Sequence, residues 1–256
     1  MFKLFCFLRS CLHMAWMVVT VVPFACAILL LTPFVSKRLL YVIASTWLRH
    51  VVVSLRFFCG VRWRIQGMEH IPLEGVAPVI LAKHQSTYET FLLPAILPRP
   101  IAYVYKKELN WVPFFGWAIA QLDMVHIDRK QGRAAFRKVT EEGGRIMAAG
   151  TSVAMFPEGT RIPRGQVGEY KTGGTRLALA TGCAIVPIAI TSAQCWPRKG
   201  FIKYPGVVDV SIGAPIAAVK GRSADDLMEQ AKGFIEGEMQ RLDAQAYPAL
   251  TQGEPA

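Results

Sequence analysis

A histidine and a glutamate stand five positions apart in the segment AKHQSTYETF, at His84 and Glu89. A neutral imidazole has an ordinary pKa of about 6.5, which suits a general base near neutral pH. A carboxylate that binds one ring nitrogen fixes the tautomer and stabilises the imidazolium ion, so that the other nitrogen can take a proton from an alcohol. The pair therefore indicates base catalysis on a hydroxyl group.

Glu89 also has a purely structural interpretation. The segment from Ser86 to Glu89 has the S-x-x-E pattern of a capping box, in which Ser86 caps a helix running toward Pro94 and Glu89 accepts from the Ser86 backbone. In that case His84 is an ordinary loop histidine. The two roles are compatible, because one carboxylate oxygen can serve the cap and the other the imidazole. These residues alone leave both interpretations open.

The sequence contains no obvious protein nucleophile for this histidine to activate. Residues 150–154 read GTSVA, which fails the G-x-S-x-G pattern of the α/β-hydrolase elbow at its last position. A base without an enzyme nucleophile indicates that a hydroxyl of the substrate attacks directly.

A second group of reactive residue types lies about seventy positions later, in the segment VAMFPEGTR at 153–161. Proline and glycine shape a turn after an apolar run, and a carboxylate, a hydroxyl and a guanidinium follow one another at its mouth. Arg161 can hold a phosphate through two N–H donors. A surface turn with a salt bridge is the ordinary alternative for any one of these residues.

Both motifs follow short apolar runs, which are typical of buried strands. Residues five apart lie roughly 16 Å from one another along a strand, and on a helix they point about 140° apart. A strand-to-helix turn is therefore needed to bring His84 to Glu89. The sequence predicts strands at Val61–Ile65, Pro78–Ala82, Ile101–Tyr105, Met124–Ile127, Ser152–Phe156, Ala184–Ile190 and Val207–Ile212, and helices at Gln131–Ala149 and Ser223–Ala244. This pattern predicts an α/β fold with a mixed, largely buried sheet flanked by helices.

The two motifs together resemble those of the glycerolipid acyltransferase family, whose members include lysophosphatidate acyltransferases (1-acylglycerol-3-phosphate O-acyltransferases). The resemblance covers roughly residues 60–215, and weaker blocks at VHIDR (125–129) and IVPIA (185–189) agree with it. It implies transfer of a fatty acyl group from acyl-CoA or acyl carrier protein to the free hydroxyl of lysophosphatidic acid, giving phosphatidic acid without a cofactor or metal. Glycerol 3-phosphate and a lyso-aminolipid remain as alternative acceptors.

The resemblance also implies roles for particular residues. His84 is the general base and Glu89 its acid. The substrate-binding positions are Arg129, Glu158, Gly159, Thr160, Arg161 and Lys171, with Arg129 and Arg161 as phosphate contacts. Two residues depart from the family pattern: the acid is usually Asp, one methylene shorter than Glu89, and the residue before the histidine is often Asn, where this chain has Lys83.

The N-terminal part is expected to lie in a membrane. From Ser10 to Ser36 there is no Asp, Glu, Lys or Arg, and about 20 residues span a bilayer as a helix. Pro23 and Pro33 are expected to kink or break this run. A second apolar segment, Leu39–Cys59, carries three basic side chains. Two helices that dip into one leaflet and a single span both fit, and a cleaved signal peptide is disfavoured because the apolar run is too long.

The composition narrows the partners further. The chain has 256 residues, 52% of them hydrophobic, and a net charge of +11. This excess suits an anionic bilayer or phosphorylated substrates, and the sequence has no nucleic-acid-binding motif. Six cysteines without CxxC spacing indicate reduced thiols.

The domain organisation follows from these observations. We expect an anchor (1–58), an acyltransferase domain (59–245) and a tail (246–256), at the inner (cytoplasmic) membrane with the catalytic domain facing the cytoplasm. A non-enzymatic, membrane-anchored lipid-binding protein is the distant alternative.

Overall fold

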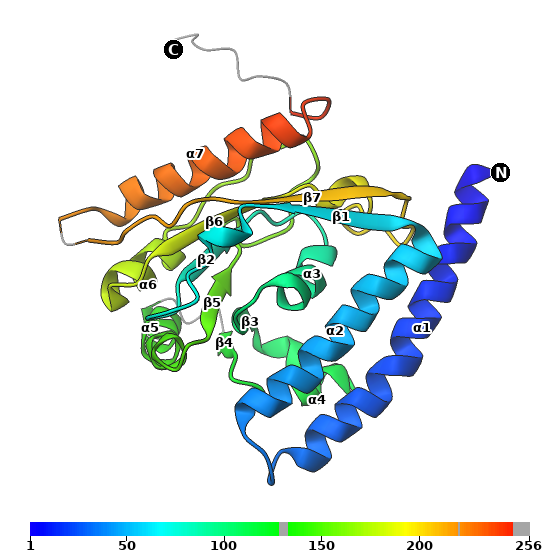
Figure 1. The fold of residues 1–256 in the computed structure, drawn as a ribbon, viewed down its shortest axis with the longest axis horizontal. Helices are drawn as coiled ribbons and strands as arrows, with labels where there is room; N and C mark the ends of the chain where they lie inside the picture. Colours follow the sequence, from blue (N-terminus) through cyan, green and yellow to red (C-terminus); the bar gives the residue numbers. More distant parts are fainter. Residues whose placement is uncertain (128–132, 220, 248–256) are drawn as a thin grey trace.

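The computed structural model describes residues 1–127, 133–219 and 221–247. In this part of the chain, two long helices lead into a seven-stranded sheet that carries helices on both faces (Figure 1). The main elements are α1 (Phe2–Leu31), α2 (Lys37–Cys59), β1 (Val61–Gln66), β2 (Val79–Ala82), α3 (Tyr88–Ile96), β3 (Ile101–Lys106), α4 (Phe115–Ile119), β4 (Val125–Ile127), α5 (Arg133–Ala148), β5 (Ser152–Met155), α6 (Gly173–Thr181), β6 (Ile185–Ile190), β7 (Gly206–Ile212) and α7 (Ala224–Leu242). Each predicted strand is present within one residue at either end, and the α/β prediction is confirmed.

The sheet is mixed, as predicted. Its order is β1-β7-β6-β2-β5-β3-β4, and each neighbouring pair is parallel except β6 and β7, which are antiparallel. Strand β2 lies in the middle, and its four residues are all buried. Ile80 and Ala82 face one core and Val79 and Leu81 face the other, because successive side chains of a strand point to opposite sides.

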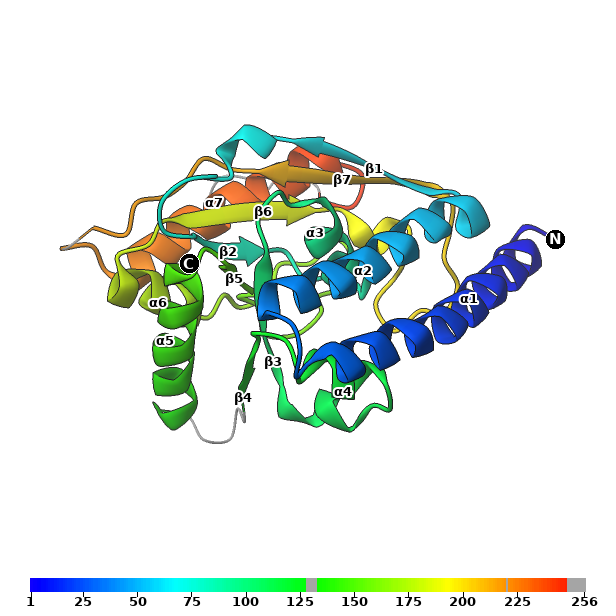
Figure 2. The same cartoon turned by 60° about the horizontal axis from the view of Figure 1, so that its bottom comes forward.

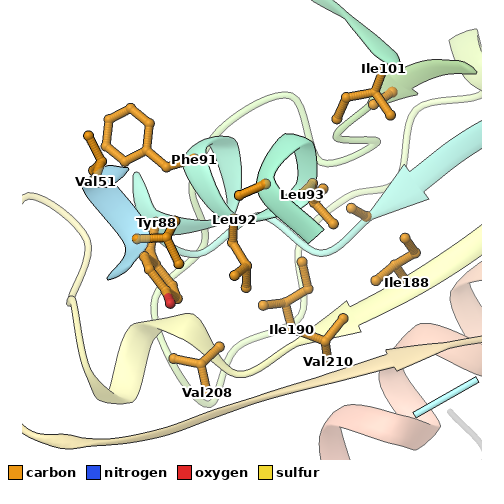
Figure 3. Close-up of a cluster of buried hydrophobic side chains, with 14 of the residues drawn as sticks. Val51, Tyr88, Phe91, Leu92, Leu93, Ile101, Ile188, Ile190, Val208 and Val210 are labelled. Atoms are coloured by element: carbon orange, nitrogen blue, oxygen red, sulfur yellow. The ribbon is translucent and has the colours of Figure 1, made fainter. Parts of the chain in front are cut away.

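One core lies between the sheet and helices α2 and α3 (Figure 3). Leu92 and Leu93 of α3 are fully buried against Ile188 and Ile190 of β6, and Val51 of α2 joins the same cluster. Burial of each such side chain is worth about 1.5–3 kcal/mol relative to exposure. This core fixes α3, the helix that carries Glu89.

The opposite face is covered by α5, α6 and α7 (Figures 1 and 2). Helix α7 packs on β6 through Ile235 and Met239, which are fully buried. Ser223, the first residue of the predicted helix, is its N-cap, since its hydroxyl accepts from the Asp226 backbone N–H at 3.0 Å. Tyr247, which the sequence placed in a loose tail, is buried beyond the end of α7, because its ring joins the core of Ile235 and Met239.

Helices α1 and α2 form an antiparallel pair beside the sheet (Figure 1). Pro33 lies in the turn between them, but α1 runs through Pro23 without a break, so of the kink or break predicted at Pro23 the break is wrong. Contact with α2 holds the turn of α1 that precedes Pro23, because the indole N–H of Trp47 in α2 donates to Thr20 Oγ1 in α1 at 3.1 Å. Among the described helices, α1 and α2 are long and apolar enough to cross a membrane, and they suggest membrane association.

Candidate active site

Strands β2 and β5 bring the two motifs together. They are adjacent and parallel, with Leu81 paired to Met155, so that their carboxyl ends open at the same edge of the sheet. The backbone N–H of His84 donates to Glu158 Oε2 at 2.8 Å, and the N–H of Ile162 donates to the His84 carbonyl at 2.8 Å. The loops after β2 and β5 are therefore bonded directly to each other.

The His84–Glu89 pair is formed in the structure. His84 Nδ1 lies 3.1 Å from Glu89 Oε1, and the Glu89 side chain is completely buried. The same oxygen accepts from the backbone N–H groups of Gln85 at 2.5 Å and Ser86 at 2.7 Å. Glu89 thus orients the histidine and organises the start of α3, but with one oxygen instead of two. Its Oε2 has no hydrogen-bond partner in the described part of the chain.

The capping box is only half formed. Helix α3 begins at Tyr88 with Thr87 as the N-cap residue, so the prediction of Ser86 as the N-cap is wrong by one position. The Ser86 hydroxyl accepts from the Tyr88 backbone N–H at 3.1 Å. This shift arises because Glu89 draws the N–H groups of Gln85 and Ser86 into a tight turn before the helix begins.

The imidazole is held on its face as well as at its edge. The His84 ring stacks on Phe156 with centroids 4.0 Å apart, and Phe156 stacks on Tyr103 at 5.8 Å. The His84 side chain keeps 13% of its surface exposed. Since Nδ1 donates to Glu89, Nε2 carries the lone pair and can accept a proton from a substrate.

A buried ionic cluster lies behind this loop. The ammonium group of Lys83, with no exposed surface, is 2.7 Å from Glu158 Oε1 and 2.6 Å from Glu236 Oε1. The Tyr170 hydroxyl donates to the same oxygen of Glu236 at 2.6 Å. Burial alone lowers the pKa of Lys83, but attraction to the two carboxylates outweighs it and raises the pKa above its usual value. Lys83 therefore stays charged and holds Glu158 beneath His84.

A cavity of about 890 Å³ opens beside His84. Its polar end is lined by His84, Thr160, Arg161 and Lys171. Its apolar part extends between the N-terminal helices, α3 and α4, and is lined by residues such as Val21, Phe24, Ile28, Trp47, Phe91 and Phe115. Phe115 comes from the aromatic stretch at 111–117, whose Trp111 is 80% exposed. The cavity thus has room for an acyl chain next to a base and cations.

The structure brings most of the predicted site residues together, but these residues do not all face the cavity. Gly159 has φ of +65°, and a Cβ there would contact the Lys171 side chain at 3.7 Å. Arg161 lines the cavity, and its buried Nε has no hydrogen-bond partner in the described chain. Glu158 faces Lys83 and the His84 backbone and does not line the cavity. Arg129 lies outside the described residues.

Sequence reasoning missed several residues at the site. Lys106, Arg198 and Lys199 also line the cavity, and no motif marks them. Glu236 lies 153 positions from its partner Lys83, too far for any local pattern to connect them. The one available signal was that Lys83 directly follows a buried strand, where a lysine needs an acidic partner. The described residues contain no group of three or more His, Cys, Asp or Glu side chains that could hold a metal ion.

These features fit a class of enzyme in which a histidine at the carboxyl edge of an α/β sheet is placed to deprotonate a hydroxyl group, beside cations and an apolar cavity. The family comparison agrees with this class: the acyltransferase family model matches residues 62–191. The chain belongs to the acyltransferase family.

The relatives of this chain are similarly named. It is 39% identical over 203 residues to a 1-acyl-sn-glycerol-3-phosphate acyltransferase of Pseudomonas aeruginosa, covering 78% of this chain and 77% of that protein. It is 28% identical to a chloroplastic enzyme of that name from Arabidopsis thaliana, of which 57% is covered. The crystal structure of the 1-acyl-sn-glycerophosphate acyltransferase PlsC from Thermotoga maritima matches with a TM-score of 0.81 over 95% of this chain and 98% of that one, at 22% identity. That match shows the fold.

Proposed function

We propose that this protein is a 1-acylglycerol-3-phosphate O-acyltransferase, which acylates lysophosphatidic acid to phosphatidic acid. One observation carries the proposal: His84, oriented by Glu89 at 3.1 Å, lines the same cavity as Arg161 and Lys171 and a long apolar extension. This reaction needs three features in one site: a base, cations that bind a phosphate, and space for an acyl chain. The 39% identity to the Pseudomonas aeruginosa enzyme supports the same substrate.

The reaction proceeds by direct attack of the acceptor on the thioester. His84 Nε2 removes the proton of the acceptor hydroxyl as its oxygen bonds to the thioester carbonyl carbon. The imidazolium that forms is stabilised by Glu89 through Nδ1. The C–S bond then breaks, the ester remains, and the proton on His84 passes to the departing thiolate. No covalent acyl-enzyme intermediate is required.

The cations hold the acceptor by its phosphate. The guanidinium of Arg161 provides paired donors, with its buried Nε available, and Lys171 adds a second charge at the polar end of the cavity. Arg129, two positions after Ile127 in the sequence, is a further phosphate contact in this proposal, and Gly159 and Thr160 complete the wall around the acceptor. Glu158 acts on the substrate indirectly, because its carboxylate binds Lys83 and the His84 backbone.

The substrates account for the N-terminal helices. An acyl chain gains about 0.8 kcal/mol per CH₂ on leaving water, so acceptor and product stay in a bilayer and the active site must reach them there. Helices α1 and α2 line the apolar part of the cavity, which lets a chain pass between lipid and site. We place the protein at the inner membrane with its catalytic domain facing the cytoplasm, where acyl-CoA and acyl carrier protein are available as donors, and assign it no nucleic-acid partner.

The proposal is tested with purified protein in lipid vesicles. Thiol release and product mass are measured with lysophosphatidic acid, glycerol 3-phosphate and a lyso-aminolipid as acceptors; lysophosphatidic acid should give the highest kcat/KM.

The role of the base is tested by substitution. His84→Ala should lower kcat by about 10²–10⁴-fold with unchanged thermal stability. The matched control is His50→Ala, which removes an exposed imidazole of α2 outside the cavity. Full activity of His84→Ala, or a lipid-binding protein without turnover, would refute the proposal.

A further inference from the structure

The loop after β6 places two adjacent cations at the cavity. Arg198 and Lys199 line the cavity together with His84, and Lys199 is exposed. Neither side chain has an ion-pair partner among the described residues, where salt bridges engage many other basic side chains. The loop (yellow in Figure 2) passes beside α1, where Phe201 packs against Phe7 with centroids 5.6 Å apart.

The turn that carries these cations is rigid and strained. Lys199 has φ of +58°, a left-handed conformation that costs a side-chain-bearing residue on the order of 1 kcal/mol. The turn is closed by a hydrogen bond from Gly200 N–H to the Pro197 carbonyl at 2.9 Å. The indole N–H of Trp196 donates to the Gly200 carbonyl at 3.0 Å. Trp196 is itself buried, so the turn is fastened to the core.

The number of cations exceeds what one acceptor requires. A phosphate monoester carries at most two negative charges, and Arg161, Lys171 and Lys106 already line the cavity. Arg198 and Lys199 therefore remain for a second anionic group. The other substrate of an acyl transfer is the thioester, whose acyl part is apolar and whose carrier is hydrophilic. The carrier must stay in water at the mouth of the cavity while the thioester reaches His84.

We propose that Arg198 and Lys199 bind the anionic carrier of the acyl donor, either the phosphates of coenzyme A or the acidic surface of an acyl carrier protein. This assignment rests on the proposed function, because it names the donor side of the same site. Lys199 is exposed to solvent, as expected for a residue that binds a carrier which stays outside the cavity. Arg161, whose Nε is buried, matches the acceptor phosphate inside.

The test compares donors with and without the anionic carrier. The variant Arg198→Gln/Lys199→Gly removes both charges, and glycine is suited to the positive φ at 199, so folding should be preserved. With a long-chain acyl-CoA, kcat/KM for the donor should fall about tenfold or more, as expected for loss of charge-assisted hydrogen bonds. With the N-acetylcysteamine thioester of the same acyl group, which lacks phosphates, wild type and variant should react equally. The KM for lysophosphatidic acid should be unchanged.

Further arms define the carrier and exclude a simple charge effect. Acyl carrier protein thioesters replace acyl-CoA in a parallel series, and the series with the larger loss identifies the carrier that these cations meet. The control variant Arg62→Gln/Lys232→Gln removes the same total charge outside the cavity and should keep wild-type kinetics. High salt should weaken the preference of wild type for the anionic donor.

Several results overturn the inference. An equal loss with both thioesters would mean that the turn only supports the fold or the acceptor, and a raised KM for lysophosphatidic acid alone would assign it to the acceptor phosphate or lipid headgroups. Unchanged donor kinetics would remove any role in carrier binding. These results require an active wild type; if wild type is inactive with every donor, the proposed function fails and this inference fails with it.

Discussion

At the scale of single residues, one oxygen of Glu89 has a structural role and, in the proposed mechanism, a catalytic role as well, and substitutions can separate the two. Glu89→Gln keeps an oxygen that can accept from Gln85, Ser86 and His84 but removes the charge that stabilises the imidazolium. We expect kcat to fall about 100-fold while the free energy of unfolding changes by less than about 1 kcal/mol. Glu89→Ala also leaves buried N–H donors unpaired and should cost a further 1–3 kcal/mol, roughly. Full activity of Glu89→Gln would make Glu89 a structural residue only.

Arg161 is the residue-scale test of phosphate recognition. Arg161→Ala should raise the KM for lysophosphatidic acid by about tenfold or more with little effect on kcat, because it removes paired donors from the ground state and transition state alike. Arg161→Lys should recover part of the affinity, since lysine keeps the charge but lacks the planar pair of donors. Monoacylglycerol, an acceptor without phosphate, serves as the control. If its kinetics change in the same way, Arg161 supports the loop and does not bind phosphate.

At the scale of elements, the buried cluster of Lys83, Glu158 and Glu236 couples α7 to both catalytic loops. Lys83→Met leaves two buried carboxylates without a counter-ion and should destabilise the protein by about 3–5 kcal/mol. Glu236→Gln keeps the pair of Lys83 with Glu158 and should cost less in both stability and kcat. The double variant Lys83→Met/Glu236→Gln should therefore be more stable than Lys83→Met. Chemical denaturation and kcat of the folded enzyme measure both effects, and equal losses in the two single variants would contradict this coupling.

The same cluster predicts a pH dependence with a definite sign. Because the folded protein raises the pKa of Lys83, its stabilising charge is complete below the ordinary lysine pKa and is lost only as pH rises through the still higher folded value. Wild-type stability should thus keep this contribution from pH 7 to 9. Burial raises the pKa of the Glu158 carboxyl above its usual value. In Lys83→Met this carboxyl has lost its counter-ion, so its ionisation costs more as pH rises, and the stability of the variant relative to wild type should decrease with pH. A constant difference across this range would argue against charge as the cause.

The sequence predicted elements and local motifs better than long-range partnerships. Each predicted strand formed because its apolar run fits a buried sheet, and His84 and Arg161 were recognised because each lies within a short motif. Helix α6, which begins with Gly173 and Gly174, was not predicted, since glycine is a poor helix former. The partnership of Lys83 with Glu236 depends on how α7 packs on the sheet. No local pattern encodes that contact, nor the place of Arg198 at the cavity.

At the scale of the whole molecule, the exposed face of α1 should determine where the enzyme works. Leu12 and Val19 are 58% and 68% exposed, and seven positions apart they lie on one helix face. Leu12→Lys/Val19→Lys puts two charges on this face, and a charge within a bilayer costs about 2.5–3.5 kcal/mol by insertion scales. Binding to lipid vesicles should fall at least tenfold, whereas kcat with a water-soluble short-chain acceptor should persist because neither residue lines the cavity. Leu73→Lys/Val167→Lys, which changes two exposed apolar residues in other loops, should bind vesicles like wild type. If the α1 variant also sediments with vesicles like wild type, this face does not meet lipid, and the enzyme must take its substrates from the bilayer through another surface.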